Sequence, residues 1–210
     1  MNTSISEIIE QANMFFDNSE NIFTSLENDT KKYSNGFWGA SILIEETPFD
    51  FERSQLKRGK KMMKSPKNKA DKSFHLQNES GDVVAVFGYI ENYEFPNTYK
   101  FIQNDKIYTF DIQQKIQCVQ QNFFENNMMS QSISIQKNGD YILEFYHYDS
   151  SNRLIEIERK HRNKRTFHDT SFFPDNVYST TFILEYADNE LIKIFWNAPQ
   201  RESKQIWTRT

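Results

Sequence analysis

The sequence predicts a mainly β protein: an antiparallel meander, as a curved sheet or a partly closed barrel, with one or two N-terminal helices. Two copies of a strand–turn–strand pattern support this prediction, at residues 146–157 and 184–194. Each copy has a run that ends in an aromatic residue, a polar turn, and then Leu-Ile, a charged residue and Ile. Beyond Ser73 apolar and polar residues alternate with a period of two, which is typical of strands with one buried face.

The high aromatic content indicates a core built from rings on strands. The chain has 210 residues, of which 19 are Phe and 10 are Tyr. Rings pack well on a pleated surface, and a chain of this length can bury a sizeable core. We therefore expect a helical segment at 1–30, packed on the sheet, and one antiparallel β domain at 31–210.

Apolar residues at helical spacing predict helix from residue 4 to about residue 28. Ser4 and Glu7 fit a capping box, in which a hydroxyl and a carboxylate satisfy free amide groups of the first turn. The polar residues 17–19 divide this stretch into two helices. Each has its own apolar stripe: Ile5, Ile8, Ile9 and Ala12 in the first, and Ile22, Phe23 and Leu26 in the second. Helices this short need a partner, and the sheet is the expected one.

The expected strands begin at 36–45, with a short one at 49–52. The basic segment 57–72 contains Gly59 and Pro66 and has no regular apolar period, so we expect a mobile loop there. Residues 113–130 fit either a short helix or a strand. Three hairpins are expected in addition to the two copies of the strand–turn–strand pattern: they pair 74–76 with 83–87, 99–102 with 107–112, and 132–135 with 141–145. Residues 203–208 are expected to form the last strand of the sheet.

One turn carries a specific prediction. Asn138-Gly139 joins two of the expected strands. Asn-Gly favours a type I′ hairpin turn, in which both central residues need a positive φ.

Charge is distributed unevenly along the chain. The formal net charge is −4, from 25 basic and 29 acidic residues. Eight of the basic residues and one acid lie between Lys57 and Lys72, which leaves a net charge of −11 on the rest of the chain. An acidic body with one basic segment is the expected result.

The first copy of the strand–turn–strand pattern resembles the repeat of the RHS/YD-repeat proteins. In that repeat a Tyr-Asp pair precedes a Gly- or Asn-containing turn and Arg-Leu, as in Tyr148-Asp149 and Asn152-Arg153-Leu154. The second copy keeps the Tyr and Leu positions but lacks the Tyr-Asp pair, the Arg and one turn residue. RHS proteins are large secreted shells, and this chain is too short to be one. In size and β-rich composition it is similar to the small bacterial immunity proteins encoded with such toxins. The resemblance therefore implies a cytosolic protein that neutralises a toxin domain.

The favoured interpretation is a non-catalytic cytoplasmic protein that binds another protein through an acidic strand face. Asp149, Glu156, Glu158 and Glu185 are expected to form this partner surface. Glu156 and Glu158 alternate on one strand and so share a face, which Glu144 joins if the register permits. Such a face can attract a basic partner such as a nuclease domain. An acidic row is more often only the solvated side of a half-buried sheet.

The alternative is a nucleic-acid-associated protein that uses the basic segments 57–72 and 159–165. Both would have to lie on one side to hold phosphates. Few aromatic residues interleave with the lysines of 57–72, which argues against stacking on single strands. The expected contacts are Lys57, Arg58, Lys60, Lys61, Lys64, Arg159, Lys160, Arg162 and Arg165.

A third interpretation is a small-ligand carrier or an enzyme with a site in the mouth of the sheet. His147 and Asp149 alternate on one strand and could meet His168 in an acid–base or metal site. Metal-ligand spacing of the known motifs is missing, however, and we expect no metal. The phosphate-binding, nucleophile-elbow and zinc motifs are also missing, so no cofactor and no catalytic residue is expected.

Localisation follows from a few negative features. Cys118 is the single cysteine, which cannot form an internal disulfide. No apolar run is long enough to span a membrane, and the first residues do not resemble a signal peptide. We expect a cytoplasmic protein that does not bind membranes.

Overall fold

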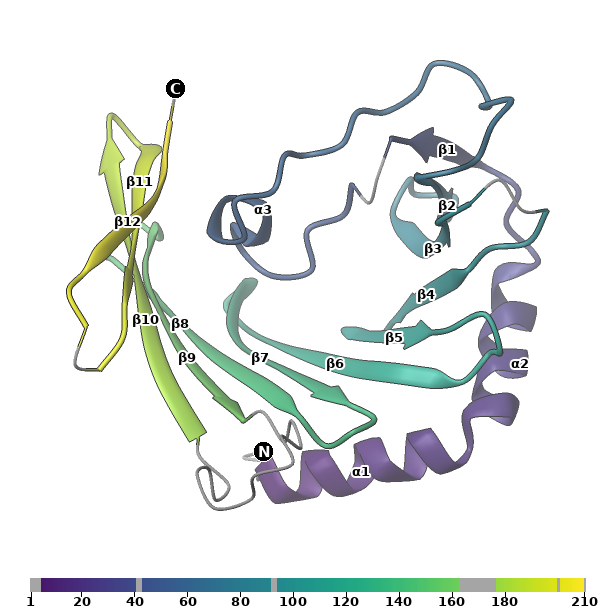
Figure 1. Cartoon of the computed structure of the whole chain (residues 1–210), viewed down its shortest axis with the longest axis horizontal. Coiled ribbons are helices and arrows are strands. Elements are labelled where there is room, and N and C mark those ends of the chain that lie inside the picture. The colour runs from purple at the N-terminus through teal and green to yellow at the C-terminus, as the bar shows by residue number, and fades with distance from the viewer. Residues whose placement is uncertain (1–4, 41–42, 92–93, 163–176, 200, 210) are drawn as a thin grey trace. The chain divides into compact units, whose positions relative to one another are not determined.

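The computed structural model describes residues 5–40, 43–91, 94–162, 177–199 and 201–209 (Figure 1). These residues form three helices and twelve strands. The helices are α1 (Ile5–Asp17), α2 (Ser19–Thr30) and α3 (Asp50–Arg53). The strands are β1 (Gly36–Gly39), β2 (Lys72–Gln77), β3 (Val83–Tyr89), β4 (Thr98–Gln103), β5 (Lys106–Phe110), β6 (Ile116–Glu125), β7 (Met128–Gln136), β8 (Tyr141–Tyr148), β9 (Leu154–Arg162), β10 (Val177–Ala187), β11 (Glu190–Asn197) and β12 (Lys204–Thr208).

The strands form an antiparallel meander in which the order in the sheet follows the order in the chain, from β1 to β12. The predicted mainly β meander with N-terminal helices is therefore confirmed. The order does not return from β12 to β1, so the sheet is open and not a barrel. None of the described helices is long and apolar enough to span a membrane.

Contacts divide the chain into two compact units. Unit 1 comprises residues 1–44 and 58–120, and unit 2 comprises residues 45–57 and 121–210. The segment 45–57 therefore leaves unit 1 between β1 and β2 and packs within unit 2. The expected division into 1–30 and 31–210 stays a prediction; α1 and α2 belong to unit 1 together with β1–β5.

In unit 1, α2 packs its predicted apolar stripe on the strands. The Phe23 ring meets the rings of Phe101 and Phe110 edge-on, with centroid distances of 5.6 and 5.1 Å. Leu26 belongs to the same buried cluster. Edge-to-face ring pairs contribute about 0.5–1.5 kcal/mol each beyond their buried area. These contacts supply the partner that short helices need.

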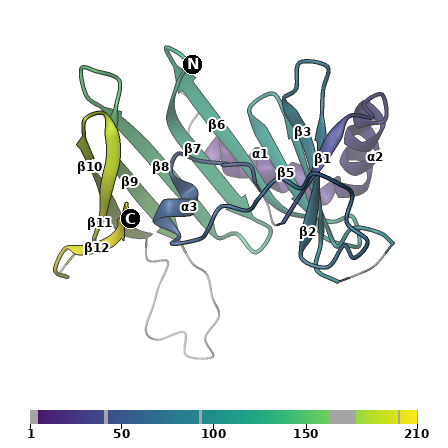
Figure 2. The same ribbon diagram turned by 90° about the horizontal axis from the view of Figure 1, so that it is seen from above.

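In unit 2, the core lies on one face of β8–β11, which lie side by side in Figures 1 and 2. Phe49, just before α3, packs against this core. The helix itself contacts β12. The buried core residues are Tyr146, Leu154, Ile157, Phe182, Leu184 and Ile194.

The hairpins use two kinds of turn. Four turns have a single residue with positive φ, at Gly81, Gln114, Gly139 and Asn152. In each of these a residue three positions earlier accepts a hydrogen bond from that residue, as Gln136 O does from Gly139 N at 2.8 Å. This is the type I turn with a following left-handed residue. Three other turns have two successive residues with positive φ: Asn104-Asp105, Asn126-Asn127 and Asp188-Asn189. Two such residues are the mark of a type I′ turn.

Three local predictions are corrected, and one open alternative is decided. Asn138 has no positive φ, so the expected type I′ turn at Asn138-Gly139 is wrong. The short strand expected at 49–52 is the helix α3, which follows a left-handed Phe49 (φ 56°). The strand expected at 36–45 ends at Gly39. For the stretch 113–130, the strand alternative is confirmed at 116–125 in β6 and at 128–130 in β7.

Residues 60–62 of the basic segment lie along the outer edge of β1. The amide of Ala40 donates to Lys60 O at 3.0 Å, and the amide of Met62 donates to Trp38 O at 2.8 Å. Lys61 lies opposite Gly39 in this short pairing. An edge covered in this way is less open to pairing with other chains. The expected mobility of 57–72 stays a prediction.

Candidate functional site

Three of the four acids expected to bind a partner share one face of unit 2. The register pairs Glu156 with His147 and Ile183, and residues paired across antiparallel strands project to the same side. Glu158 and Glu185 lie on this side by alternation. We call it the Glu156 face, formed by Phe145, His147, Glu156, Glu158, Thr181, Ile183, Glu185, Lys193 and Phe195.

The Glu156 face is not uniformly acidic. Glu158 Oε1 lies 3.0 Å from Lys160 Nζ, and Glu185 Oε2 lies 3.8 Å from Lys193 Nζ. Phe145 is only half-buried, and Lys160 lies over its ring at 5.5 Å. The face therefore combines paired charges with half-buried apolar side chains.

Asp149 has a different role from the other predicted acids. It lies in the β8–β9 turn, where its Oδ1 accepts hydrogen bonds from the amides of Ser151 (2.8 Å) and Arg153 (3.0 Å). Its Oδ2 accepts from Arg153 Nε at 2.7 Å. The backbone and side-chain hydrogen bonds from Arg153 lower the pKa of Asp149 below its ordinary value. Asp149 therefore stabilises its own turn, and its place in a partner surface stays a prediction.

The opposite face of the same strands holds a buried ionic cluster that sequence reasoning missed. Glu144 lies opposite Arg159 in the register, so it does not join Glu156 and Glu158. The Glu144 residue is 2% exposed. Arg53 Nη1 donates to its Oε1 at 2.5 Å, and Arg159 Nε donates to the same oxygen at 2.7 Å. Tyr146 OH donates to Oε2 at 2.6 Å. We call these residues, with Ser132, the Glu144 cluster.

The Glu144 cluster keeps its carboxylate charged. Burial acts to raise the pKa of the Glu144 carboxyl, but the guanidinium groups of Arg53 and Arg159 outweigh burial and lower that pKa below its ordinary value. Burial, reinforced by the Glu144 carboxylate, raises the pKa of Tyr146. The Tyr146 hydroxyl also shares a hydrogen bond of 2.8 Å with Ser132. A carboxylate engaged by three donors is a poor general base, so this cluster fits a structural role better than a catalytic one.

Arg53 connects the cluster to the segment 45–57. Its Nε donates to Pro48 O at 3.1 Å, and its Nη2 donates to Thr47 Oγ1 at 2.7 Å. Its guanidinium also lies 5.2 Å from the centre of the Phe182 ring. The Arg53 residue is 6% exposed. One arginine therefore organises its own segment and fixes it to the strands of unit 2.

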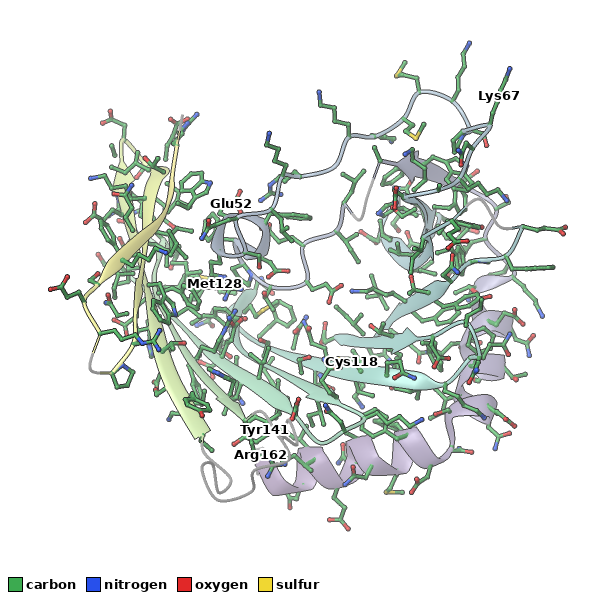
Figure 3. All side chains as sticks on the ribbon, in the orientation of Figure 1. Glu52, Lys67, Cys118, Met128, Tyr141 and Arg162 are labelled. Carbon is green, nitrogen blue, oxygen red and sulfur yellow. The ribbon has the colours of Figure 1, made fainter. Side chains whose placement is uncertain are left out.

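In its described part, residues 159–162, the second basic run does not form one basic surface. Arg159 is bound to Glu144, and Lys160 projects to the other face beside Glu158. Arg162 Nη2 donates to Gly139 O at 2.9 Å, and the Arg162 guanidinium lies 5.1 Å from the centre of the Tyr141 ring (both residues are labelled in Figure 3). Arg165 lies outside the described residues.

The first basic segment places lysines over the rings of neighbouring strands. Lys61 Nζ lies 4.4 Å from the centre of the Phe37 ring. Lys69 Nζ lies 5.0 Å from the Tyr89 ring and 6.0 Å from the Trp38 ring. Phe37 and Trp38 alternate on β1, so the lysines lie on both of its faces. Among the other predicted contacts, the carbonyl of Lys60 accepts a hydrogen bond from Ala40, just after β1. Arg58 and Lys64 also belong to unit 1, whereas Lys57 belongs to unit 2. Lys67 extends away from the ribbon (Figure 3).

The described residues include only two members of the histidine site considered above, His147 and Asp149, so that site stays a prediction. His147 is exposed and lies opposite Glu156, while Asp149 is committed to its turn. His168 lies outside the described residues. In the part of the chain that the structure describes, no three His, Cys, Asp or Glu side chains are placed to hold a metal ion.

Comparisons of the chain with protein-family models, with curated proteins and with solved structures found no match.

Proposed function

We propose that this protein is a non-catalytic binding protein for another protein, in the manner of an immunity protein that covers a toxin domain. The Glu156 face is the proposed contact surface. The observation that supports this is its composition: half-buried Phe145, Ile183 and Phe195 lie among paired charges on adjacent strands. Protein–protein interfaces combine aromatic residues at the centre with a polar rim.

The acids on this face favour a partner with a basic surface. Glu156 lies between His147 on β8 and Ile183 on β10, and no ion pair is found for it among the described residues. The lysines beside Glu158 and Glu185 would have to turn away or exchange partners on binding. Complementary charge mainly raises the rate of association and the discrimination between partners.

The test is a pull-down with the wild-type protein as bait, followed by calorimetric titration of the purified protein that it recovers. We expect a stoichiometric complex with the wild-type protein, and about tenfold or greater weakening with the double variant Glu156→Lys/Phe145→Asp. Glu79→Lys, an exposed acid in the β2–β3 turn, is the matched control and should leave the affinity unchanged. No complex with the wild-type protein, or equal weakening by the control, would refute the proposal.

A second candidate function is nucleic-acid binding at the β1 edge, and the lysines that lie over Phe37, Trp38 and Tyr89 favour it. Lysine and aromatic side chains together are what single-stranded nucleic acids contact in proteins. The rings come from the strands beside the basic segment, which the linear sequence did not show.

Fluorescence anisotropy with labelled single-stranded DNA tests this second candidate. Binding should weaken steeply as the salt concentration rises. Lys61→Glu and Lys69→Glu should each reduce affinity, while Lys204→Glu on β12 should not. Binding that is insensitive to salt, or absent, would remove this candidate.

A further inference from the structure

A ring-walled cavity in unit 2 lies on the face opposite the Glu156 face. Its volume is about 500 Å³, and it lies over β9, β10 and β11 where β9 ends and β10 begins. His161 and Arg159 alternate on β9, so the cavity shares a face with the Glu144 cluster. Cavities that hold small molecules usually measure roughly 300–1,000 Å³. The volume of this cavity falls within that range, so it can hold a small molecule.

Aromatic rings and an imidazole ring line this cavity. The rings of His161 and Tyr178 stack at a centroid distance of 5.2 Å with planes 23° apart. Trp196, on the neighbouring strand β11, supplies another ring, and Thr180 lies between them along β10. Stacked and offset ring contacts favour a planar guest. The shape therefore selects for an aromatic or heteroaromatic ring.

The charge at the cavity is positive. Arg201 belongs to the lining and is exposed, with its guanidinium 6.0 Å from the centre of the Trp196 ring. None of the described lining residues is acidic. A guanidinium group presents paired donors that match a carboxylate. A ligand with an anionic group beside its ring is therefore favoured over a cationic one.

His161 adds a neutral polar group. Its Nδ1 atom is buried and has no hydrogen-bond partner among the described residues. Burial, and to a smaller degree the charge of Arg159, lower the pKa of His161, so the ring is uncharged near pH 7. A neutral imidazole offers one donor and one acceptor. Buried polar atoms usually have a partner, and a bound ligand would supply one.

We propose that this cavity binds a small planar aromatic carboxylate, with its ring between Trp196 and the His161–Tyr178 pair and its carboxylate on Arg201. This goes beyond the proposed protein-binding function and does not depend on it, because the rings of His161, Tyr178 and Trp196 lie on the face opposite the Glu156 face.

The experiment uses three probes and calorimetry on the full chain. Indole-3-acetate should bind saturably. Tryptamine, which has the same ring and a cationic tail, and cyclohexylacetate, which has the carboxylate without a planar ring, should each bind at least about tenfold more weakly. Arg201→Gln should weaken indole-3-acetate at least about tenfold, and Trp196→Leu should abolish its binding.

The controls separate this site from others. Trp38→Leu removes a tryptophan of unit 1 and should leave binding unchanged, and circular dichroism checks the fold of every variant. Arg201 is exposed, so Arg201→Gln stays informative even if Trp196→Leu fails to fold. Absence of saturable binding by indole-3-acetate, equal binding of tryptamine, or unchanged binding by Arg201→Gln would each overturn the proposal.

Discussion

The charged side chain of Glu144 has almost no access to water, so the stability of unit 2 depends on the groups around it. Removing a carboxylate from water costs several kcal/mol unless nearby charges and donors compensate. Here two guanidinium groups and a phenol do so. The compensation comes from two places in the chain, Arg159 on the next strand and Arg53 from 91 residues away. Loss of either arginine should therefore be far more damaging than loss of an exposed one.

Arg53→Met is expected to destabilise unit 2 by about 3 kcal/mol, since breaking a buried ion pair costs about 3–5 kcal/mol and Arg159 remains. Denaturant unfolding in a Trp38→Phe background measures this, because Trp196 and Trp207 then report unit 2 alone. Adding Glu144→Gln to Arg53→Met should recover part of the loss. Lys193→Ala, which breaks the exposed pair with Glu185 in unit 2, is the control and should cost about 0.5 kcal/mol or less. Equal effects of the two single variants would contradict the expectation.

His75 is the corresponding buried residue of unit 1. It is fully buried, its ring stacks on Phe37 at 4.8 Å, and its Nε2 accepts a hydrogen bond from the amide of Leu43 at 3.1 Å. Burial lowers the pKa of His75, and the nearby backbone of Ser73 and Phe37 only partly offsets this. The folded protein thus holds the ring neutral, whereas the unfolded chain titrates it near about pH 6.5.

Unit 1 should lose stability when the pH falls. A group whose pKa is lowered in the folded state stabilises the fold above its unfolded pKa, and this contribution is lost below it. The free energy of unfolding should therefore drop between about pH 7.5 and 5.5, as measured by hydrogen exchange of the β2 and β3 amides. His75→Gln should flatten this dependence, whereas His161→Gln, in unit 2, should leave it in place. The same pH dependence in wild type and His75→Gln would contradict the assignment.

At the scale of the elements, the turns explain what the repeated pattern means. The two copies use different turns: the first has one left-handed residue, Asn152, and the second has the pair Asp188-Asn189. The missing turn residue of the second copy is therefore a change of turn type. Alternation predicted the strands because one face is buried in each unit. It misassigned 49–52, because Arg53 anchors these residues as a helix through a contact that is distant in sequence.

The sites were less predictable than the strands. Glu144 occupies a polar position of an alternating strand, so it resembled the solvated acids Glu156 and Glu158. Only the register, which pairs it with Arg159, shows that it faces the core. The one feature of the sequence that could have indicated the burial of Glu144 is its position between the apolar residues Leu143 and Phe145. The cavity could not be predicted, since it depends on three strands meeting in register.

The turn at Gly139 offers a test of the hairpin assignment. Its φ of 85° is favourable only for glycine, so Gly139→Ala should lower stability by about 1–2 kcal/mol. Lys137→Ala, in the same turn but without a positive φ, is the matched control and should have little effect. The Trp38→Phe background again reports unit 2. An equal loss in both variants would contradict this turn geometry.

At the scale of the whole molecule, each unit is expected to lose stability separately when its own core is changed. Each has its own buried cluster, around Phe23 and Phe101 in unit 1 and around Ile157 and Phe182 in unit 2. A variant that removes the Glu144–Arg53 pair acts on the second cluster alone.

Hydrogen exchange measured by mass spectrometry tests this separation. Arg53→Met should raise exchange in peptides from β8–β10 while leaving those from β2–β5 near their wild-type values. The variant Phe23→Ala should do the reverse. Uniform acceleration across all strands in either variant would show that the two units unfold together.

Because residues 45–57 pack within unit 2, they determine which fragments of the chain can fold alone. A truncated product that starts at residue 121 would keep Glu144 and Arg159 but lose Arg53, and with it the clamp between residues 45–57 and the strands. Because unit 2 includes residues from both halves of the chain, dividing the chain at one position cannot give two complete folded units. Splicing residues 45–57 onto the C-terminal piece through a designed linker, in contrast, should restore a soluble fragment.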